Sequence, residues 1–172
     1  PLLDLHYSRS RLQLATADAL YSDGDHYRPM RIGFKQIKEF LPEVKKVLVL
    51  GTGLGSAVQV MDRMGYHPEF TMVDHDSTVL KWAMEALPGY GVQITPVCAD
   101  AQQYMADNHS QFDLLIVDIF NGRIVPGFVV TNDFLSLCRN SIRPGGKMVM
   151  NYIVQRNEDW SPVDKTIRRI FP

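Results

Sequence analysis

A glycine-rich turn and a set of aspartates are the parts of this chain that could do chemistry. Gly51, Gly53 and Gly55 alternate directly after the apolar run at residues 47–50, and glycine lets a backbone approach a ligand closely. Asp74 ends the next apolar run, where a carboxylate can accept hydrogen bonds from ribose hydroxyls. Together the turn and Asp74 predict a site for a nucleoside-containing cofactor.

The spacing of the glycines indicates which cofactor. A dinucleotide site has glycine at the first, third and sixth positions of the turn. Here the third glycine is at the fifth position, and Ser56 occupies the sixth. This spacing is typical of S-adenosylmethionine (SAM) sites, in which no pyrophosphate lies on the helix N-terminus. A tight turn that binds no ligand is the alternative.

Further polar residues are expected where other strands end, which is where doubly wound sheets bind ligands. Asp100 and Ala101 follow the third apolar run, so Asp100 either accepts a hydrogen bond from an adenine amino group or caps the next helix. Asp76 is more consistent with a helix cap. We expect His75 in an exposed loop beside the adenosine, and because one histidine makes no metal site, we expect no metal.

Asp118 is the residue that we predict to be catalytic. It ends the apolar run at 114–117, and the loop that follows contains Asn121, Gly122 and Gly127, which suits a flexible lid over a small pocket. A carboxylate there can orient an incoming nucleophile and accept its proton. The alternative is an acid that only satisfies loop amides.

Length and composition favour one globular domain. The 172 residues can bury a large core, and the formal net charge of −1 does not support nucleic-acid binding by bulk electrostatics. Cys98 and Cys138 form no C-x-x-C pair, no run has the length of a membrane span and no signal peptide is visible. We therefore expect a cytoplasmic protein that binds neither nucleic acid nor a membrane.

Strand and helix patterns alternate along the chain, which predicts a three-layer α/β fold with a mostly parallel sheet. Residues 1–29 are expected to form an N-terminal extension or short hairpin, and residues 30–172 the SAM-binding domain. Two final strands of the full fold are expected to be missing, and because the sequence begins with Pro1, we expect a fragment. The predicted strands are 47–50, 70–73, 92–97, 114–117 and 148–153, and the predicted helices are 30–41, 56–64, 79–87, 134–138 and 161–170.

With these residues in place, the chain resembles the spermidine synthase family, the aminopropyltransferase branch of the class I SAM-dependent methyltransferase fold, over roughly residues 25–152. The family's G-G-G-D-G loop is similar to residues 51–55, and its ribose-binding V-E-x-D to residues 73–76. Its adenine-contacting aspartate matches Asp100, its D-x-x-D-P loop matches residues 118–121, and its Y-H-E-M segment matches residues 27–30. The resemblance implies a transferase of polyamine biosynthesis that uses decarboxylated SAM and forms a homodimer.

Departures from the family pattern favour a different transferred group. Leu54 replaces the loop aspartate that faces the aminopropyl tail, and Asn121 replaces an acid that helps to bind the polyamine. Arg28 stands where the family has histidine, and it either reaches the carboxylate of ordinary SAM or lies on an exposed turn. Tyr27 either lines the acceptor pocket or only packs. We therefore expect Tyr27, Arg28 and Asn121 to bind the substrate and SAM itself to donate a methyl group.

Three functional hypotheses follow from the sequence. The first is a SAM-dependent transferase that acts on a small molecule, with methyl transfer ahead of aminopropyl transfer from decarboxylated SAM to an amine. The second is an NAD-type oxidoreductase, which the glycine spacing disfavours. The third is a nucleoside-binding module without catalytic activity.

Overall fold

The computed structural model describes residues 2–8, 11–87, 89–155 and 159–172. Its strands are β1 (Asp4–Ser8), β2 (Arg11–Ala15), β3 (Leu20–Ser22), β4 (Lys46–Leu50), β5 (Glu69–Asp74), β6 (Ile94–Cys98), β7 (Phe112–Val117) and β8 (Ile142–Met150). Its helices are α1 (Arg28–Gln36), α2 (Ser56–Arg63), α3 (Ser77–Ala86), α4 (Ala101–Asp107), α5 (Asn132–Asn140) and α6 (Ser161–Ile170), with short 3-10 helices η1 (Leu41–Glu43) and η2 (Gly127–Val130).

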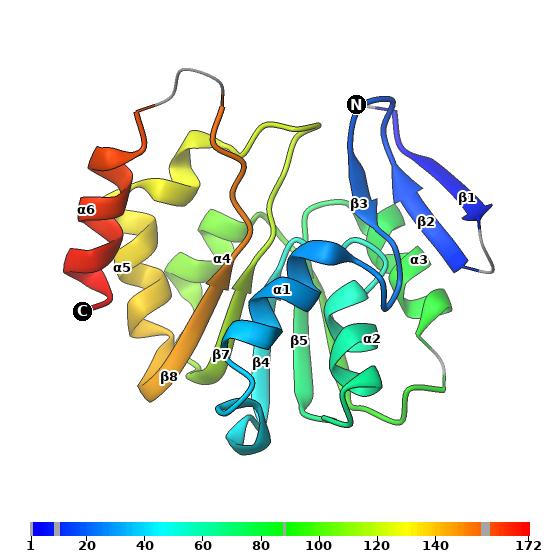
Figure 1. Cartoon of the computed structure of the whole chain (residues 1–172), viewed down its shortest axis with the longest axis horizontal. Coiled ribbons are helices and arrows are strands. Elements are labelled where there is room, and N and C mark those ends of the chain that lie inside the picture. Colours follow the sequence, from blue (N-terminus) through cyan, green and yellow to red (C-terminus); the bar gives the residue numbers. More distant parts are fainter. Residues whose placement is uncertain (1, 9–10, 88, 156–158) are drawn as a thin grey trace.

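The central sheet has the strand order β6-β5-β4-β7-β8, and every neighbouring pair is parallel. The chain leaves β4 in one direction, through β5 and β6, and returns on the other side of β4 as β7 and β8 (Figure 1). The strand order therefore reverses between β4 and β7, which is where a doubly wound sheet binds its ligand. This architecture confirms the predicted α/β, Rossmann-like fold.

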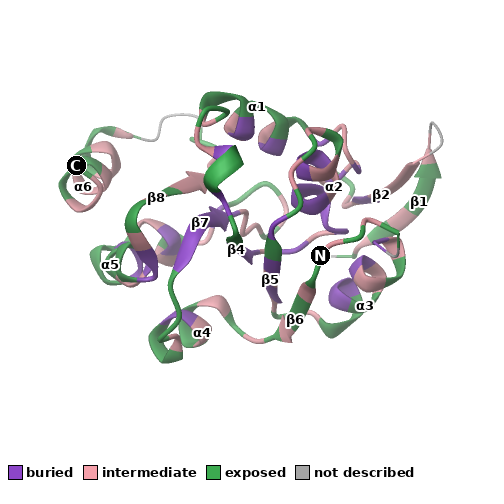
Figure 2. Cartoon of the chain, turned by 90° about the horizontal axis from the view of Figure 1, so that it is seen from below, coloured by how far each residue is buried: buried purple, intermediate pink, exposed green. Residues whose placement is uncertain are grey.

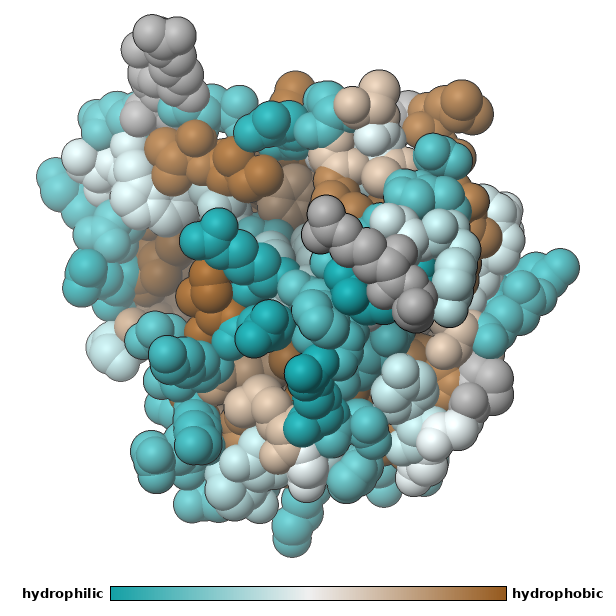
Figure 3. All heavy atoms as spheres, turned by 45° about the vertical axis from the view of Figure 1, so that its right-hand side comes forward, coloured by the Kyte–Doolittle hydropathy of each residue, from teal (hydrophilic) through white to brown (hydrophobic). Residues whose placement is uncertain are grey.

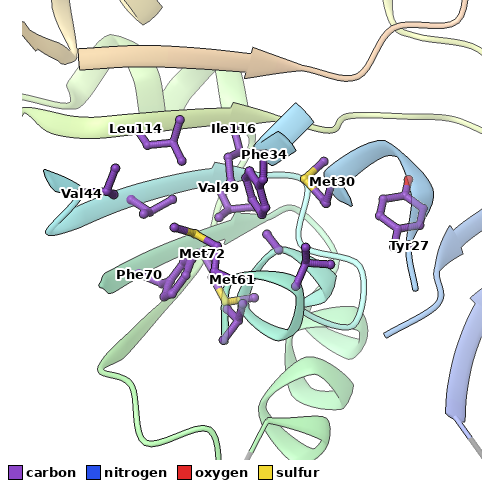
Figure 4. Packing of buried hydrophobic residues seen from close by; sticks show 14 of the residues in the cluster. Tyr27, Met30, Phe34, Val44, Val49, Met61, Phe70, Met72, Leu114 and Ile116 are labelled. Atoms are coloured by element: carbon purple, nitrogen blue, oxygen red, sulfur yellow. The ribbon is translucent and has the colours of Figure 1, made fainter. Parts of the chain in front are cut away.

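Alternating side chains of the central strands enter two separate cores, one on each face of the sheet. On one face Val47 and Val49 of β4 pack with the buried residues of α1 and α2. Figure 4 shows Met30 and Phe34 of α1 close to Val49. On the other face Leu48 of β4 packs with residues of α4 and α5. All six residues of β7 are buried, whereas α6 has no buried residue (Figure 2).

The N-terminal residues form a second, small sheet. Strands β1, β2 and β3 pair antiparallel in that order, so the segment contains one strand more than a single hairpin. In Figure 1 this sheet stands beside the carboxyl ends of the central strands. Leu14 of β2 packs with Leu54 of the glycine turn and Val79 of α3. The small sheet is therefore fixed to the part of the fold that contains the glycine turn.

Several predicted element boundaries need correction. The helix expected at 30–41 is α1, which begins at Arg28 because Pro29 fits the first turn. It ends at Gln36, after which the Ile37 N–H donates to the Phe34 carbonyl, and the separate turn η1 follows. The strand expected at 92–97 is displaced slightly, to Ile94–Cys98.

The last strand was predicted at 148–153 but is β8, Ile142–Met150. It begins before the sequence Pro144-Gly145-Gly146, which resembles a turn. A shift in register between Phe112 and Leu114 of β7 accommodates this irregular segment, in which Gly145 has a φ of 81°. The helix predicted at 161–170 is confirmed as Ser161–Ile170, and Trp160 occupies its N-cap position.

No helix among the described residues is long and apolar enough to cross a membrane. Figure 3 turns the side of the molecule with the N-terminal sheet forward, and its hydrophobic patches there are separated by hydrophilic residues.

Candidate functional site

A cavity of about 380 Å³ opens at the carboxyl ends of the central strands, a volume in the range of small-molecule sites. Its wall combines the ends of β4 to β7, the loop after β7 and the small N-terminal sheet. It is lined by Leu3, Leu14, Tyr21, Tyr27, Gly51, Gly53, Val73, Asp74, His75, Asp76, Val79, Ala99, Asp100, Ala101, Asp118, Ile119, Phe120, Asn121, Pro126 and Phe128.

The glycines of the turn after β4 have different surroundings. Gly51 and Gly53 line the cavity, and both have positive φ angles, 86° and 50°, which glycine adopts without strain. A Cβ on Gly51 would lie 2.2 Å from the backbone oxygen of Asp118, so β4 and β7 end in close contact. Gly55 does not line the cavity, and a Cβ there would lie 2.5 Å from Cδ1 of Leu87, so that the Leu87 side chain would have to shift.

Asp74 connects the glycine turn to the start of the next helix. Its Oδ2 accepts a hydrogen bond from the Thr52 N–H at 2.9 Å, and its Oδ1 accepts one from the Asp76 N–H at 3.0 Å. The side chain is 12% exposed and lines the cavity. These bonds fix the carboxylate at the cavity wall, and each oxygen keeps a further lone pair for a hydrogen-bond donor.

Asp76 and Asp100 are helix caps as well as cavity residues. The Asp76 carboxylate accepts from the N–H groups of Thr78 and Val79 at the start of α3. The Asp100 carboxylate accepts from two N–H groups at the start of α4. The capping role expected for Asp76 and the capping alternative for Asp100 are therefore both present. Asp100 and Ala101 also line the cavity, so a contact with a base is still open to them.

Asp118 lies where three segments of the chain meet. The Asn151 side-chain amide donates to Oδ1 of Asp118 at 2.8 Å, and the Tyr27 hydroxyl donates to the same oxygen at 3.4 Å. Asn151 also reaches the Tyr27 oxygen at 3.4 Å. Tyr27 is 5% exposed, and Figure 4 shows its hydroxyl at the edge of the apolar cluster. The three side chains form one hydrogen-bonded group, and two of its members, Tyr27 and Asp118, line the cavity.

Burial controls the protonation of this group. Loss of solvation raises the pKa of Asp118 to about 6, while the hydrogen bonds from Asn151 and Tyr27 oppose that rise. Burial, and then the nearby Asp118 charge, raises the pKa of Tyr27, so its hydroxyl stays protonated. A carboxylate with a pKa near 6 can accept a proton close to neutral pH.

The remaining predicted site residues are more exposed. His75 lines the cavity with its side chain 80% exposed, 3.6 Å from Asp74. Asn121 also lines the cavity and is exposed. Arg28, the first residue of α1, is exposed and does not line it. Among the residues that the structure describes, no group of three His, Cys, Asp or Glu side chains is placed to hold a metal ion.

The interpretation of Leu54 is corrected by the structure. Leu54 was expected to face the tail of the cofactor, but it is 1% exposed and packs with Leu14 and Val79. It is not part of the cavity wall. Its apolar side chain joins the N-terminal sheet to α3, so the residue that replaces the family's aspartate has a packing role here.

Two contributors to the site were not among the predicted site residues. Asn151, near the end of the last predicted strand, was expected to be able to reach the pocket but was not assigned a role. Tyr21 of β3 lines the cavity, and its hydroxyl accepts a hydrogen bond from the Gly122 N–H of the loop after β7. Nothing in the local sequence around Tyr21 indicates this contact, because it joins residues 101 positions apart.

The strand order and the alternating helices give this chain a Rossmann-like α/β fold of the methyltransferase type. Residues 35–172 match the family model described as the spermine/spermidine synthase domain. Because this match covers most of the chain, the chain belongs to the spermine/spermidine synthase domain family.

Individual relatives agree with this assignment. The chain is 29% identical over 112 residues to a polyamine aminopropyltransferase of Enterobacter sp. (strain 638), a match that covers 61% of this chain and 38% of the relative. A similar match to a probable polyamine aminopropyl transferase of Bifidobacterium longum, at 26% identity, covers 60% of this chain and 23% of the relative. The chain thus spans well under half the length of these curated relatives.

Solved structures support the fold. A spermidine synthase in complex with the transition-state analogue AdoDATO aligns with a TM-score of 0.69 at 18% identity, covering 99% of this chain and 61% of that one. A SAM-dependent methyltransferase from Agrobacterium tumefaciens aligns with a TM-score of 0.67 at 20% identity, covering 98% of this chain and 58% of that one. Both alignments cover nearly all of this chain, so they support its fold.

Proposed function

We propose that this chain binds decarboxylated SAM and transfers its aminopropyl group to an amine, with Asp118 as the proton acceptor. The observation that carries the proposal is the charge of the cavity. Its described lining contains four carboxylates, those of Asp74, Asp76, Asp100 and Asp118, and neither lysine nor arginine. Such a wall favours ligands that are cationic and have no carboxylate of their own.

The same observation disfavours methyl transfer from ordinary SAM. Among the residues that the structure describes, the carboxylate of SAM would meet no lysine or arginine in the cavity wall, since Arg28 is exposed outside it. Leu54 does not face the tail of the cofactor. Two of the three residues on which the methyl-transfer hypothesis depended, Leu54 and Arg28, therefore do not support it, and the relatives named as aminopropyltransferases support the alternative.

The residues present fit the nucleoside part of the donor. Asp74 would accept hydrogen bonds from the ribose hydroxyls, and Asp100 with Ala101 would border the adenine. When bound, decarboxylated SAM supplies a methylene carbon made electrophilic by the neighbouring sulfonium. Because Gly51 and Gly53 have no side chains, the backbone of the turn can lie directly against the ligand.

Asp118 supplies the acid–base chemistry in this proposal. A nitrogen–carbon bond forms, the carbon–sulfur bond breaks with its electron pair going to sulfur, and a proton moves from nitrogen to Asp118. Asn151 and Tyr27 hold Oδ1 of Asp118, which leaves Oδ2 for the amine. General-base catalysis of this kind contributes roughly 10²–10⁴-fold to a rate.

The test combines binding with turnover. Calorimetry should show decarboxylated SAM binding at least tenfold more tightly than SAM. Release of methylthioadenosine from decarboxylated SAM and a mixture of primary amines should be detectable by chromatography. The variant Asp118→Asn should lose about 10²–10⁴-fold in turnover, whereas Asp107→Asn, an exposed change at the end of α4, should leave turnover unchanged.

Other outcomes would identify another function. Tighter binding of SAM, with a methylated product, would restore the methyl-transfer hypothesis. Tight nucleoside binding with no turnover in the wild type would indicate a binding module.

A further inference from the structure

We propose that Ser56 is a positioning residue of the transfer reaction, which acts through the segment at residues 22–27 and holds Tyr27 against Asp118. This inference rests on the proposed function and adds a residue from outside the cavity wall to the same site. Ser56 occupies the position where a dinucleotide-binding turn has its third glycine. The contacts of its hydroxyl carry the inference.

The Ser56 hydroxyl is buried at the junction of the glycine turn and the N-terminal sheet. Ser56 is the first residue of α2 and is 4% exposed. Its Oγ lies 2.6 Å from Oγ of Ser22, the last residue of β3, and it accepts a hydrogen bond from the Asp23 N–H at 3.3 Å. Ser22 is fully buried as well. Because a buried hydroxyl is costly to leave unpaired, this contact holds the two segments in one arrangement.

The glycine turn and the end of β3 lie in direct contact at this junction. A Cβ on Gly53 would lie 3.0 Å from the Tyr21 backbone oxygen and 3.4 Å from the Ser22 Cβ. Glycine at position 53 therefore lets β3 lie against the turn, which brings Ser22 within reach of Ser56.

A second contact from α2 holds the same segment more weakly. Arg63 lies two helical turns after Ser56, so both side chains are on one side of α2. The Arg63 guanidinium forms an ion pair with Asp25, but its side chain is 59% exposed, and exposed ion pairs contribute little. The buried contact between Ser56 and Ser22 is therefore the main anchor of the segment.

The anchored segment leads directly to Tyr27. The His26 N–H donates to the Asp23 carbonyl at 3.0 Å, which closes a turn. The Tyr27 N–H donates to the Gly24 carbonyl at 3.3 Å and continues it. The Tyr27 hydroxyl then reaches Oδ1 of Asp118 at 3.4 Å, the long end of the range for a hydrogen bond, so a small displacement of the turn breaks this contact.

A double-mutant cycle tests whether Ser56 acts through Tyr27. With decarboxylated SAM and a mixture of primary amines, Ser56→Ala and Tyr27→Phe should each lower kcat about tenfold, because misplaced catalytic groups lose up to about 10²-fold per ångström. KM for decarboxylated SAM should stay within about threefold of the wild type, since the predicted nucleoside contacts are unchanged. The double variant should lose no more than about twofold beyond Tyr27→Phe alone.

Two further variants separate positioning from an effect on folding. Ser22→Ala removes the same hydrogen bond from its other partner and should reproduce the loss in kcat. Ser141→Ala removes a hydroxyl that is also 4% exposed and that accepts from Asn108 at the end of α5. It should leave kcat within about twofold of the wild type. Binding of methylthioadenosine, measured by calorimetry, shows that each variant is folded, and Ser22→Ala replaces Ser56→Ala in the cycle if the latter does not bind.

The results distinguish this inference from the proposed function. An unchanged kcat in Ser56→Ala would overturn the inference and leave aminopropyl transfer standing. Losses that multiply in the double variant would also overturn it, because Ser56 would then act independently of Tyr27. Absence of methylthioadenosine release by the wild type would overturn the proposed function itself, and this inference with it.

Discussion

Asn151 and Asp118 are brought together by the register of β7 and β8. Val117 of β7 pairs with Met150 of β8, so the residues that directly follow these two partners emerge side by side at the same edge of the sheet. The Asn151 amide then lies 2.8 Å from Oδ1 of Asp118, and the Asn151 N–H donates to the Val117 carbonyl. The sheet itself therefore positions the carboxylate.

This contact predicts the effect of Asn151→Leu on the pH dependence of activity. The Asn151 hydrogen bond stabilises the charged carboxylate, so its loss raises the pKa of Asp118 further above about 6. The acidic limb of the kcat/KM profile should move to higher pH, because this limb reports the free enzyme's base. Tyr27→Phe, which removes the longer contact at 3.4 Å, should produce a smaller shift. An unmoved limb in Asn151→Leu would contradict this role.

The raised pKa of Asp118 also predicts how stability depends on pH. Because burial raises this pKa from 3.8 to about 6, the folded state binds the proton more tightly than the unfolded state. The contribution to the free energy of unfolding is therefore fully present below pH 4 and is lost as the pH rises through about 6.

Asp118→Asn removes this titration while preserving the shape of the side chain. The free energy of unfolding of the variant, relative to the wild type, should increase between pH 4 and pH 7 by up to about 3 kcal/mol. Urea unfolding at both pH values measures it. A difference that is constant with pH would show that Asp118 titrates normally.

Much of the fold could be predicted because its signals are local. The strands β4 and β7 are short apolar runs, and the caps at Asp76 and Thr131 are recognisable side chains before helices. The start of β8 was missed because Pro144-Gly145-Gly146 lies inside that strand. The irregular segment is accommodated by a register shift between β7 and β8. Such a tertiary effect leaves no local pattern in the sequence.

The site could be predicted where its residues lie at or directly after the ends of strands. Asp74, Asp100 and Asp118 lie in the cavity wall as expected. The orientation of Leu54 was not predictable, because the alignment of a motif gives a residue its place in the turn but not the direction of its side chain. Packing against Leu14 of a distant strand determines that direction.

Asp74 should be essential for binding the nucleoside. Its two backbone hydrogen bonds join the glycine turn to the start of α3, and its side chain lines the cavity. Asp74→Asn should weaken binding of methylthioadenosine by about 10–100-fold, consistent with about 1.5–3 kcal/mol for hydrogen bonds to a charged group. His75→Ala, at an 80% exposed side chain, should change the affinity less than threefold. Calorimetry compares the two, and equal losses would contradict the role of Asp74.

Tyr21→Phe should loosen the loop after β7. The Gly122 N–H donates to the Tyr21 hydroxyl, and this bond joins the small N-terminal sheet to the loop at the cavity. Without it, the Gly122 amide should exchange its hydrogen faster, because loop opening exposes it to solvent. Tyr7→Phe, at a side chain that is 73% exposed on β1, should leave this exchange unchanged. Hydrogen-exchange mass spectrometry of the peptide that contains Gly122 measures both variants.

Gly51→Ala should be the most damaging of the small substitutions near the site. Gly51 has a φ of 86°, and an added Cβ would lie 2.2 Å from the Asp118 backbone oxygen. The ends of β4 and β7 would have to separate, which should lower the free energy of unfolding by at least 2 kcal/mol and displace the predicted base.

Gly127→Ala is the matched control, because a Cβ there would meet no atom within 4 Å and its φ is not positive. That variant should stay within about 0.5 kcal/mol of the wild type or be slightly more stable. If urea unfolding gives both variants the same stability, the contact between Gly51 and Asp118 does not hold the two strand ends together.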